Sequence, residues 1–167
     1  MGDLFSGEPS EASASIATFA IDLTVVPRTI DPAAISQRLG LEPTWVWRAG
    51  QRVRNPNGTL RSYLEREPRW TLKTKYHDRR EDDLDVWNEM DGALGPRLND
   101  RLTAFLEPFL REQSFVSELV ADSITGSITL NFPGQFHFGF VIEPATLSAI
   151  AGLGLDLGIE IFPNSAT

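Results

Sequence analysis

The chain has 167 residues, the usual length of one domain, and 41% of them are hydrophobic, so it can bury a core and is not generally disordered. It contains no cysteine, which excludes structural disulfides, thiolate metal sites and cysteine nucleophiles, and fits a reducing compartment such as the cytoplasm. The formal net charge is −8, which argues against a general nucleic-acid binder, because phosphate binding needs a positive surface.

The ends of the chain are predicted to lie outside the folded part. The first 14 residues, MGDLFSGEPSEASA, are acidic and lack the apolar stretch of a secretory signal, so we expect a flexible leader over 1–14. Residues 15–163 are predicted to form a single α+β domain, and 164–167 a short tail. No run approaches the ~18 apolar residues that a membrane helix needs, so we expect no membrane partner.

A strand and a helix are the first predicted elements. Residues 15–26 are rich in β-branched and aromatic side chains and alternate as in a strand that is covered on one side. Asp31 is suited to cap the start of a helix, and Pro32 suits the first helical position, where its missing N–H costs nothing. Gly40 is placed to end this helix.

Two extended segments follow. Residues 42–47 read as an extended piece, and the sequence NPNG over 55–58 is typical of a turn. Residues 69–76 alternate again, which predicts a strand with Trp70 and Leu72 facing the core and the lysines facing solvent.

The longest helical signal covers residues 81–111. Apolar side chains recur there every three or four residues, which is the repeat of one face of a helix. Gly95 and Pro96 fall inside the run and predict a kink or two abutting helices. Acidic side chains lie at the start of this segment, where the positive end of the helix dipole favours negative charge.

The last third resumes strand character. We expect strands over 117–122, 125–132 and 135–142, with Pro133 and Gly134 as the hairpin turn between the last two. A helix is predicted over 143–152, and a final strand over 155–162.

Two stretches of the chain resemble each other, residues 31–41 and residues 143–153. Each begins with an acidic residue, proline and alanine, and each passes through a glycine before a leucine. Helix-capping rules alone could produce these features, but the shared order favours a structural repeat. The predicted fold is therefore α+β, with a mostly antiparallel sheet, helices packed on one face, and two ferredoxin-like strand–helix–strand units forming a pseudo-repeat.

No catalytic or metal-binding constellation is recognisable. His77 and His137 lie in different segments, and neither has a partner at ligand spacing, so strand and loop positions explain them. The acidic residues of 81–85 lack the spacing of a calcium loop. No phosphate-binding or nucleophile motif is present. We expect no metal, no cofactor and no catalytic residues.

One basic segment stands out in this acidic chain. Between Arg48 and Arg80 lie ten Lys/Arg and three acidic residues, a net charge of +7, which leaves −15 for the rest of the chain. Its tryptophans and arginines could stack on bases, bind a phosphate or carboxylate in a bidentate manner, or dock an acidic protein surface. The alternative is that a tryptophan anchors the core while the arginines keep a loop soluble. The candidate binding residues are Trp45, Trp47, Arg48, Arg52, Arg54 and Arg69.

Short motifs, in a fixed order over roughly residues 16–163, carry a family resemblance. They are the strand Phe19–Val25, Ile30-Asp31-Pro32 through Leu39-Gly40-Leu41-Glu42-Pro43-Thr44, Gly50, Trp70-Thr71-Leu72, the long amphipathic helix, Leu147 through Ile150-Ala151-Gly152-Leu153-Gly154, and Ile161-Phe162. With these features the chain resembles the bacterial domain-of-unknown-function family DUF4279. The resemblance implies a small bacterial cytoplasmic α+β domain and carries over no catalytic residues.

These observations favour a non-enzymatic binding protein, of the inhibitor or immunity type, that recognises an acidic protein partner or an anionic ligand through residues 48–80. The alternatives are an enzyme or binder acting on a phosphorylated or nucleotide ligand, with His77 or His137 as acid or base, and a protein that binds single-stranded nucleic acid through Trp45 and Trp47. The negative net charge argues against the last of these. The residues favour no particular oligomeric state.

Overall fold

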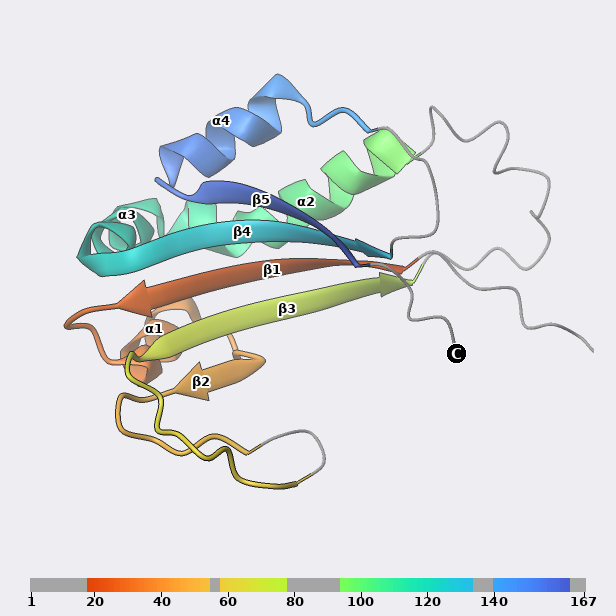
Figure 1. The fold of residues 1–167 in the computed structure, drawn as a ribbon. Helices are drawn as coiled ribbons and strands as arrows, with labels where there is room; N and C mark the ends of the chain where they lie inside the picture. Colours follow the sequence, from red (N-terminus) through yellow and green to blue (C-terminus); the bar gives the residue numbers. More distant parts are fainter. Residues whose placement is uncertain (1–17, 55–57, 78–93, 134–139, 163–167) are drawn as a thin grey trace, which may run out of the picture.

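The computed structural model of this chain contains one sheet, and helices pack against one of its faces (Figure 1). The structure describes residues 18–54, 58–77, 94–133 and 140–162. The class is α+β, as predicted. The strands are β1 (Thr18–Pro27), β2 (Trp45–Trp47), β3 (Arg69–His77), β4 (Ser123–Pro133) and β5 (Asp156–Phe162), and the helices are α1 (Pro32–Leu39), α2 (Leu94–Arg111), α3 (Gln113–Asp122) and α4 (Pro144–Gly152).

The sheet has the strand order β2-β3-β1-β4-β5. Strand β1 pairs antiparallel with both β3 and β4, and β2 pairs antiparallel with β3. Strand β5, however, lies parallel to β4. The sheet is therefore mixed, and the expectation of a mostly antiparallel sheet is corrected. The physical reason is the connection: β4 returns to β5 through α4, and a crossover helix between neighbouring strands makes them run in the same direction.

The predicted ferredoxin-like pseudo-repeat is not confirmed. Both echoed stretches do connect strand to helix to strand, as β1–α1–β2 and as β4–α4–β5. Strand β3 lies between β1 and β2, whereas β4 and β5 are direct neighbours. The helix ends differ as well, because Asp31 caps α1 with its side chain while Glu143 makes no such hydrogen bond to α4. Both helices have a proline in the first turn, which the common rules for starting a helix favour.

Helix α1 forms as its sequence predicts. The Asp31 carboxylate accepts a hydrogen bond from the backbone N–H of Ala33 at 2.8 Å, and Pro32 occupies the first helical position. Gly40 ends the helix with a φ of 64°, in the left-handed region. A residue with a Cβ is strained there, which is why glycine is favoured.

The connection from β1 to α1 is held by the last residue of α3. The Asp122 carboxylate accepts hydrogen bonds from the backbone N–H groups of Arg28, Thr29 and Ile30 at 3.1, 3.0 and 3.1 Å, and from the Thr29 hydroxyl at 2.7 Å. These bonds lower the pKa of Asp122 below its ordinary value, with those from Thr29 contributing most.

One prediction for the second half of the chain is corrected, and one stays a prediction. Helix α2 is described from Leu94, with Gly95 and Pro96 in its first described turn; residues 81–93 of the predicted helix lie outside the described residues, so the kink or pair of abutting helices at Gly95 and Pro96 stays a prediction. Residues 117–122 belong to α3 and not to a strand, because Val116 and Leu119 share one buried helical face.

Three of the remaining elements predicted for the last third of the chain are confirmed, and one is not. Strand β4 and helix α4 lie where they were predicted, and the final strand begins one residue later than expected. The strand predicted over 135–142 is not observed in its described part, residues 140–142, and its other residues lie outside the described ranges, as does Gly134 of the predicted turn.

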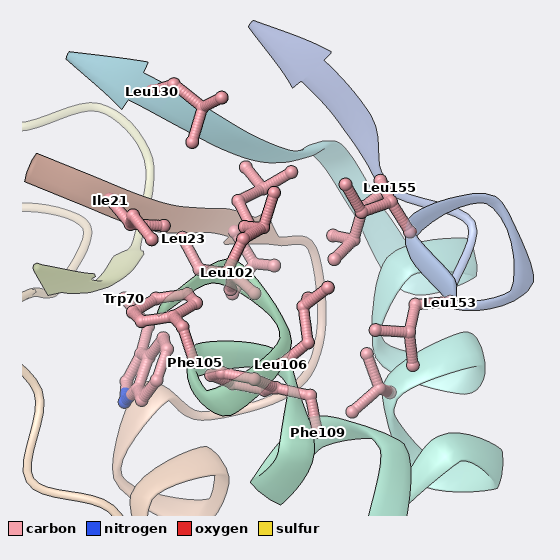
Figure 2. Packing of buried hydrophobic residues seen from close by; sticks show 14 of the residues in the cluster. Ile21, Leu23, Trp70, Leu102, Phe105, Leu106, Phe109, Leu130, Leu153 and Leu155 are labelled. Carbon is pink, nitrogen blue, oxygen red and sulfur yellow. The ribbon is translucent and has the colours of Figure 1, made fainter. Parts of the chain in front are cut away.

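The hydrophobic core lies between the sheet and the helices (Figure 2). Trp70 of β3 is fully buried, packs edge-on against Phe109 of α2 at a ring distance of 6.4 Å, and donates its indole N–H to the Ser36 hydroxyl at 2.9 Å. All four helices contribute buried side chains to this cluster, together with alternate residues of the strands. Helices therefore pack on one face, as predicted, and among the described residues the opposite face of the sheet carries none.

Candidate functional site

Both tryptophans of β2 lie on the helix-free face of the sheet. Trp45 pairs with Thr71, and Trp47 with Arg69, whereas Val46 pairs with the buried Trp70. Residues paired across a sheet point to the same side, so the side chains of Trp45 and Trp47 point away from the core. Trp45 is 45% exposed. The alternative in which one of these tryptophans anchors the core is therefore wrong, and Trp70 occupies that role.

Trp47 lies at the centre of a group of cations and aromatic rings. The guanidinium carbons of Arg61 and Arg69 lie 5.3 and 5.2 Å from the centroid of the Trp47 ring, within the range of cation–π attraction. Arg61 also lies 5.7 Å from the Tyr63 ring and donates to the Tyr63 hydroxyl at 3.0 Å. We call Trp47, Arg61, Tyr63 and Arg69 the Trp47 cluster.

The segment between β2 and β3 folds back on itself, and this brings Arg61 and Tyr63 to Trp47. The backbone N–H of Gly50 donates to the Glu65 carbonyl at 2.8 Å, and that of Glu65 donates to the Gln51 carbonyl at 2.9 Å. Further out, the N–H of Arg61 donates to the carbonyl of the buried Val53 at 2.9 Å. No local sequence pattern predicts that Arg61 and Tyr63 reach Trp47, because these backbone pairings join residues far apart in the loop.

The six candidate residues therefore do not all converge. Trp45, Trp47 and Arg69 share the helix-free face. Arg48 lies 3.8 Å from the carboxylate of Asp31 at the start of α1. Arg54 donates to the carbonyl of Gly58 and so closes its own loop. Arg52 is exposed, and no ion pair of its side chain falls within the described residues.

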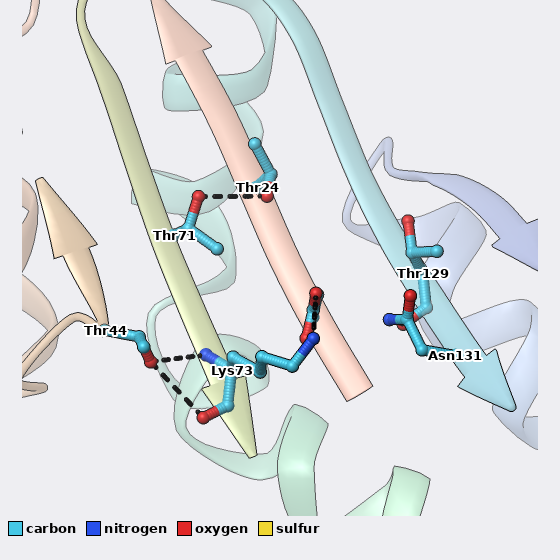
Figure 3. Close-up of polar contacts among 7 residues, drawn as sticks. Thr24, Thr44, Thr71, Lys73, Thr129 and Asn131 are labelled. Atoms are coloured by element: carbon cyan, nitrogen blue, oxygen red, sulfur yellow. Dashed lines mark hydrogen bonds and ion pairs between the residues drawn. The ribbon is translucent and has the colours of Figure 1, made fainter. Parts of the chain in front are cut away.

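A row of polar side chains crosses the sheet on the same face (Figure 3), starting from Thr71, the partner of Trp45. Lys73 of β3 pairs with Asp22 of β1 at 3.0 Å, and the two side chains are only 21% and 18% exposed. The hydroxyls of Thr24 and Thr71 lie 3.0 Å apart, in hydrogen-bond contact. Lys73 is thus partly buried, which corrects the prediction that the lysines of this strand all face solvent, while Lys75 is exposed as predicted.

Further hydrogen bonds fix this row to its neighbours. The Thr44 hydroxyl accepts from the backbone N–H of Lys73 at 2.9 Å and donates to its carbonyl at 3.3 Å. On the other side, the Asn131 amide donates to the carbonyl of Thr129 at 3.3 Å. The Oδ1 atom of Asp22 is buried and has no hydrogen-bond partner in the part of the chain that the structure describes. The Lys73 ammonium group pairs with the other carboxylate oxygen of Asp22, Oδ2, so it is already engaged within the sheet.

The face offers cations, hydrogen-bond donors and aromatic surfaces, which together suit an anionic ligand. Within the described ranges, no three His, Asp or Glu side chains are placed to hold a metal ion. The side chains of His77 and His137 and the acidic residues of 81–85 lie outside the described residues. No described helix is long and apolar enough to cross a membrane.

A comparison with protein families gives a match. The family model of a domain of unknown function, DUF4279, matches residues 17–109, which is more than half of the chain. It ends within α2, earlier than the resemblance of the sequence motifs suggests, and it includes β2, β3 and the Trp47 cluster. None of the curated proteins and none of the solved structures matches the chain.

Proposed function

Because the chain belongs to the domain-of-unknown-function family DUF4279, whose description assigns no role, we propose a function from the protein's own surface. The protein is a non-enzymatic binding protein that recognises an acidic protein partner. The recognition surface is the helix-free side of β2 and β3 with the loop between them. We place the protein in the bacterial cytoplasm, where an inhibitor or immunity-type protein would meet such a partner. A free anionic ligand is the alternative occupant of the same surface.

The Trp47 cluster is the observation that carries this proposal. Tryptophan, tyrosine and arginine are the residues that contribute most binding energy at protein interfaces. Arg69 stacks on Trp47 and has no ion pair among the described residues, so its in-plane N–H groups remain available to a carboxylate. Stacking also restricts the motion of the guanidinium group before a partner binds, so the side chain loses less conformational entropy on binding.

The charges around the cluster favour an acidic partner. In the described part of this segment, residues 48–54 and 58–77, there are eight Lys/Arg and two acidic residues. Ion pairs with Asp31, Glu65 and Asp22 engage three of the eight. The remaining chain is negative and repels an acidic surface, so an acidic partner is steered toward this one side. The cations without an ion pair in the described residues are Arg52, Arg54, Arg66, Arg69 and Lys75.

Fluorescence anisotropy of a short labelled peptide rich in Asp and Glu tests the proposal. Arg69→Ala should weaken binding at least about tenfold, because one charge-assisted hydrogen bond contributes roughly 1.5–3 kcal/mol. Arg38→Ala is the matched control, since Arg38 is exposed and pairs with Glu112 on the helix side of the molecule. Binding should also weaken as salt is added.

The proposal fails if the peptide does not bind at low salt, or if Arg38→Ala and Arg69→Ala weaken binding equally. Binding of inorganic phosphate and of a nucleotide, measured separately, tests the alternative of a free anionic ligand. Tighter binding of inorganic phosphate or a nucleotide than of the peptide would identify a phosphorylated ligand.

Single-stranded nucleic acid is the second candidate, because Trp45 is exposed on the same face as Trp47 and aromatic side chains on an open sheet can stack with bases. A labelled single-stranded oligonucleotide in the same assay decides between them. If it binds more tightly than the peptide, and Trp45→Ala weakens that binding by about 1–3 kcal/mol, nucleic acid replaces the protein partner.

A further inference from the structure

Strand β5 forms the edge of the sheet that lies farthest from the Trp47 cluster. Within the described residues only β4 pairs with it. Three large apolar side chains of this strand are exposed: Ile159 by 52%, Ile161 by 59% and Phe162 by 53%. An edge strand with exposed apolar side chains offers free backbone groups and a hydrophobic surface at the same place.

The sequence of β5 lacks several of the features that usually block an edge, although it contains the two acidic residues Asp156 and Glu160. Its seven residues, DLGIEIF, contain no proline and no lysine or arginine, and every residue of the strand pairs in register with β4. The opposite edge strand, β2, is only three residues long. Natural sheets protect exposed edges with short strands, prolines, bulges or lysines, and β5 has none of these.

We propose that β5 pairs antiparallel with β5 of a second copy of this chain, about a two-fold axis at Ile159, so that two sheets continue as one. In this register Ile159 faces Ile159 of the second copy, and Leu157 faces Ile161. These side chains point to the same side as Ile128, Leu130 and Phe132 of β4, so pairing extends the hydrophobic side of the sheet across the axis.

The charges of β5 select this register. With the axis at Ile159, Asp156 lies opposite Phe162 and Glu160 lies opposite Gly158, so no carboxylate meets another. A shift of two residues in one direction places Asp156 opposite Glu160, and in the other direction places Glu160 opposite itself. Like charges directly opposite each other destabilise a strand pair. A shift of one residue would turn the helices of the two copies to opposite sides.

The pairing is independent of the proposed binding function. Strands β2 and β5 lie at opposite edges of the sheet, so the two Trp47 clusters of the dimer would lie at its outer ends. Loss of dimerisation and loss of peptide binding are therefore separate results.

Sedimentation velocity of the full chain over a range of concentrations tests the association. The natural chain should show a dimer, and Ile159→Lys should shift it to the monomer mass, because two ammonium groups would meet at the axis. Val141→Lys is the matched control, since Val141 is 74% exposed and lies outside β5, and it should leave the dimer intact. Circular dichroism confirms that both variants fold. A monomer at every concentration, or a dimer that survives Ile159→Lys, overturns the proposal.

Disulfide crosslinking tests the register. The chain has no cysteine, so a single introduced thiol can pair only with itself in the second copy. Residues directly opposite in an antiparallel pair have Cα atoms about 4.5–5.5 Å apart, within the reach of a disulfide, so Ile159→Cys should crosslink under mild oxidation. Glu160→Cys is the control, because its two copies are displaced by two residues, about 7 Å along the strand. Faster crosslinking at position 160 than at 159 would contradict this register.

Discussion

The Asp122 carboxylate accepts four hydrogen bonds from residues 28–30, and these depend on its negative charge. Since the hydrogen bonds, above all those from Thr29, lower its pKa in the folded chain, ionised Asp122 contributes stability above the unfolded value of about 3.8. That contribution is lost as the pH falls from there through the lower, folded pKa.

Asp122→Asn should therefore lower the urea midpoint at pH 7, and its difference from the natural chain should shrink as the pH is lowered below about 4. Urea denaturation at a series of pH values measures this. Glu118→Gln, which changes an exposed carboxylate of the same helix, is the control and should not reproduce the pattern. A pH-independent difference between Asp122→Asn and the natural chain would contradict the assignment.

The ion pair of Asp22 and Lys73 also ties charge to stability, because both side chains are about four-fifths buried. Lys73→Met leaves the Asp22 carboxylate without its partner and should lower the free energy of unfolding by about 1–3 kcal/mol. Adding Asp22→Asn removes the unpaired charge and should recover part of that loss, which a double-mutant cycle measures by urea denaturation.

Lys75→Met serves as the control for this cycle. Lys75 lies on the same strand and the same face but is exposed, so its replacement should change stability by less than about 0.5 kcal/mol. Equal losses for the two lysine variants would show that the Asp22 pair has no special role.

At the scale of elements, the end of α1 depends on backbone conformation alone. A Cβ at Gly40 would meet no atom within 4 Å, but its φ is 64°. Gly40→Ala should therefore cost about 1–2 kcal/mol through the left-handed conformation and not through a clash. Gly152, the last residue of α4, has ordinary helical φ and room for a Cβ, so Gly152→Ala should leave stability unchanged or raise it by up to about 1 kcal/mol. Thermal denaturation of the two variants gives the comparison, and equal changes would contradict it.

The elements that the sequence predicts well are those with local signals. Helix α1 has Asp31, Pro32 and Gly40 at its ends, and β3 has a strict alternation around Trp70. Helix α3 lacks such signals: no side-chain hydrogen bond caps its start, and it ends on Ser123 in an extended conformation. Its last six residues, SELVAD, are short enough to fit a strand as well as a helix. Packing of Val116 and Leu119 into the core decides between the two.

The candidate site is predictable only in part for the same reason. Alternation along β2 places Trp45 and Trp47 on one face, and the register with β3 adds Arg69. Arg61 and Tyr63 reach Trp47 only because the loop folds back, and Arg48 is drawn instead to Asp31. Such non-local contacts depend on the assembled fold, and composition cannot supply them.

At the scale of the whole molecule, charge and topology are arranged together. The basic segment occupies the β2–β3 edge of the sheet, while β5, at the other edge, carries two acids and no cation. An acidic partner at one edge and a second copy at the other would therefore not compete for surface. The arrangement separates the proposed recognition surface from the apolar edge of β5 within a single sheet.

The position of β1 in the middle of the sheet has a consequence for biosynthesis. Of the described strands this one is synthesised first, yet one of its two neighbours is β4, and Ala20 pairs with Asn131, more than 100 residues later in the chain. Until β4 has been synthesised, one side of β1 has no partner, and contacts so distant in sequence form slowly. The nascent chain therefore carries an apolar central strand with one open side until β4 emerges, which is the kind of exposure that chaperones protect.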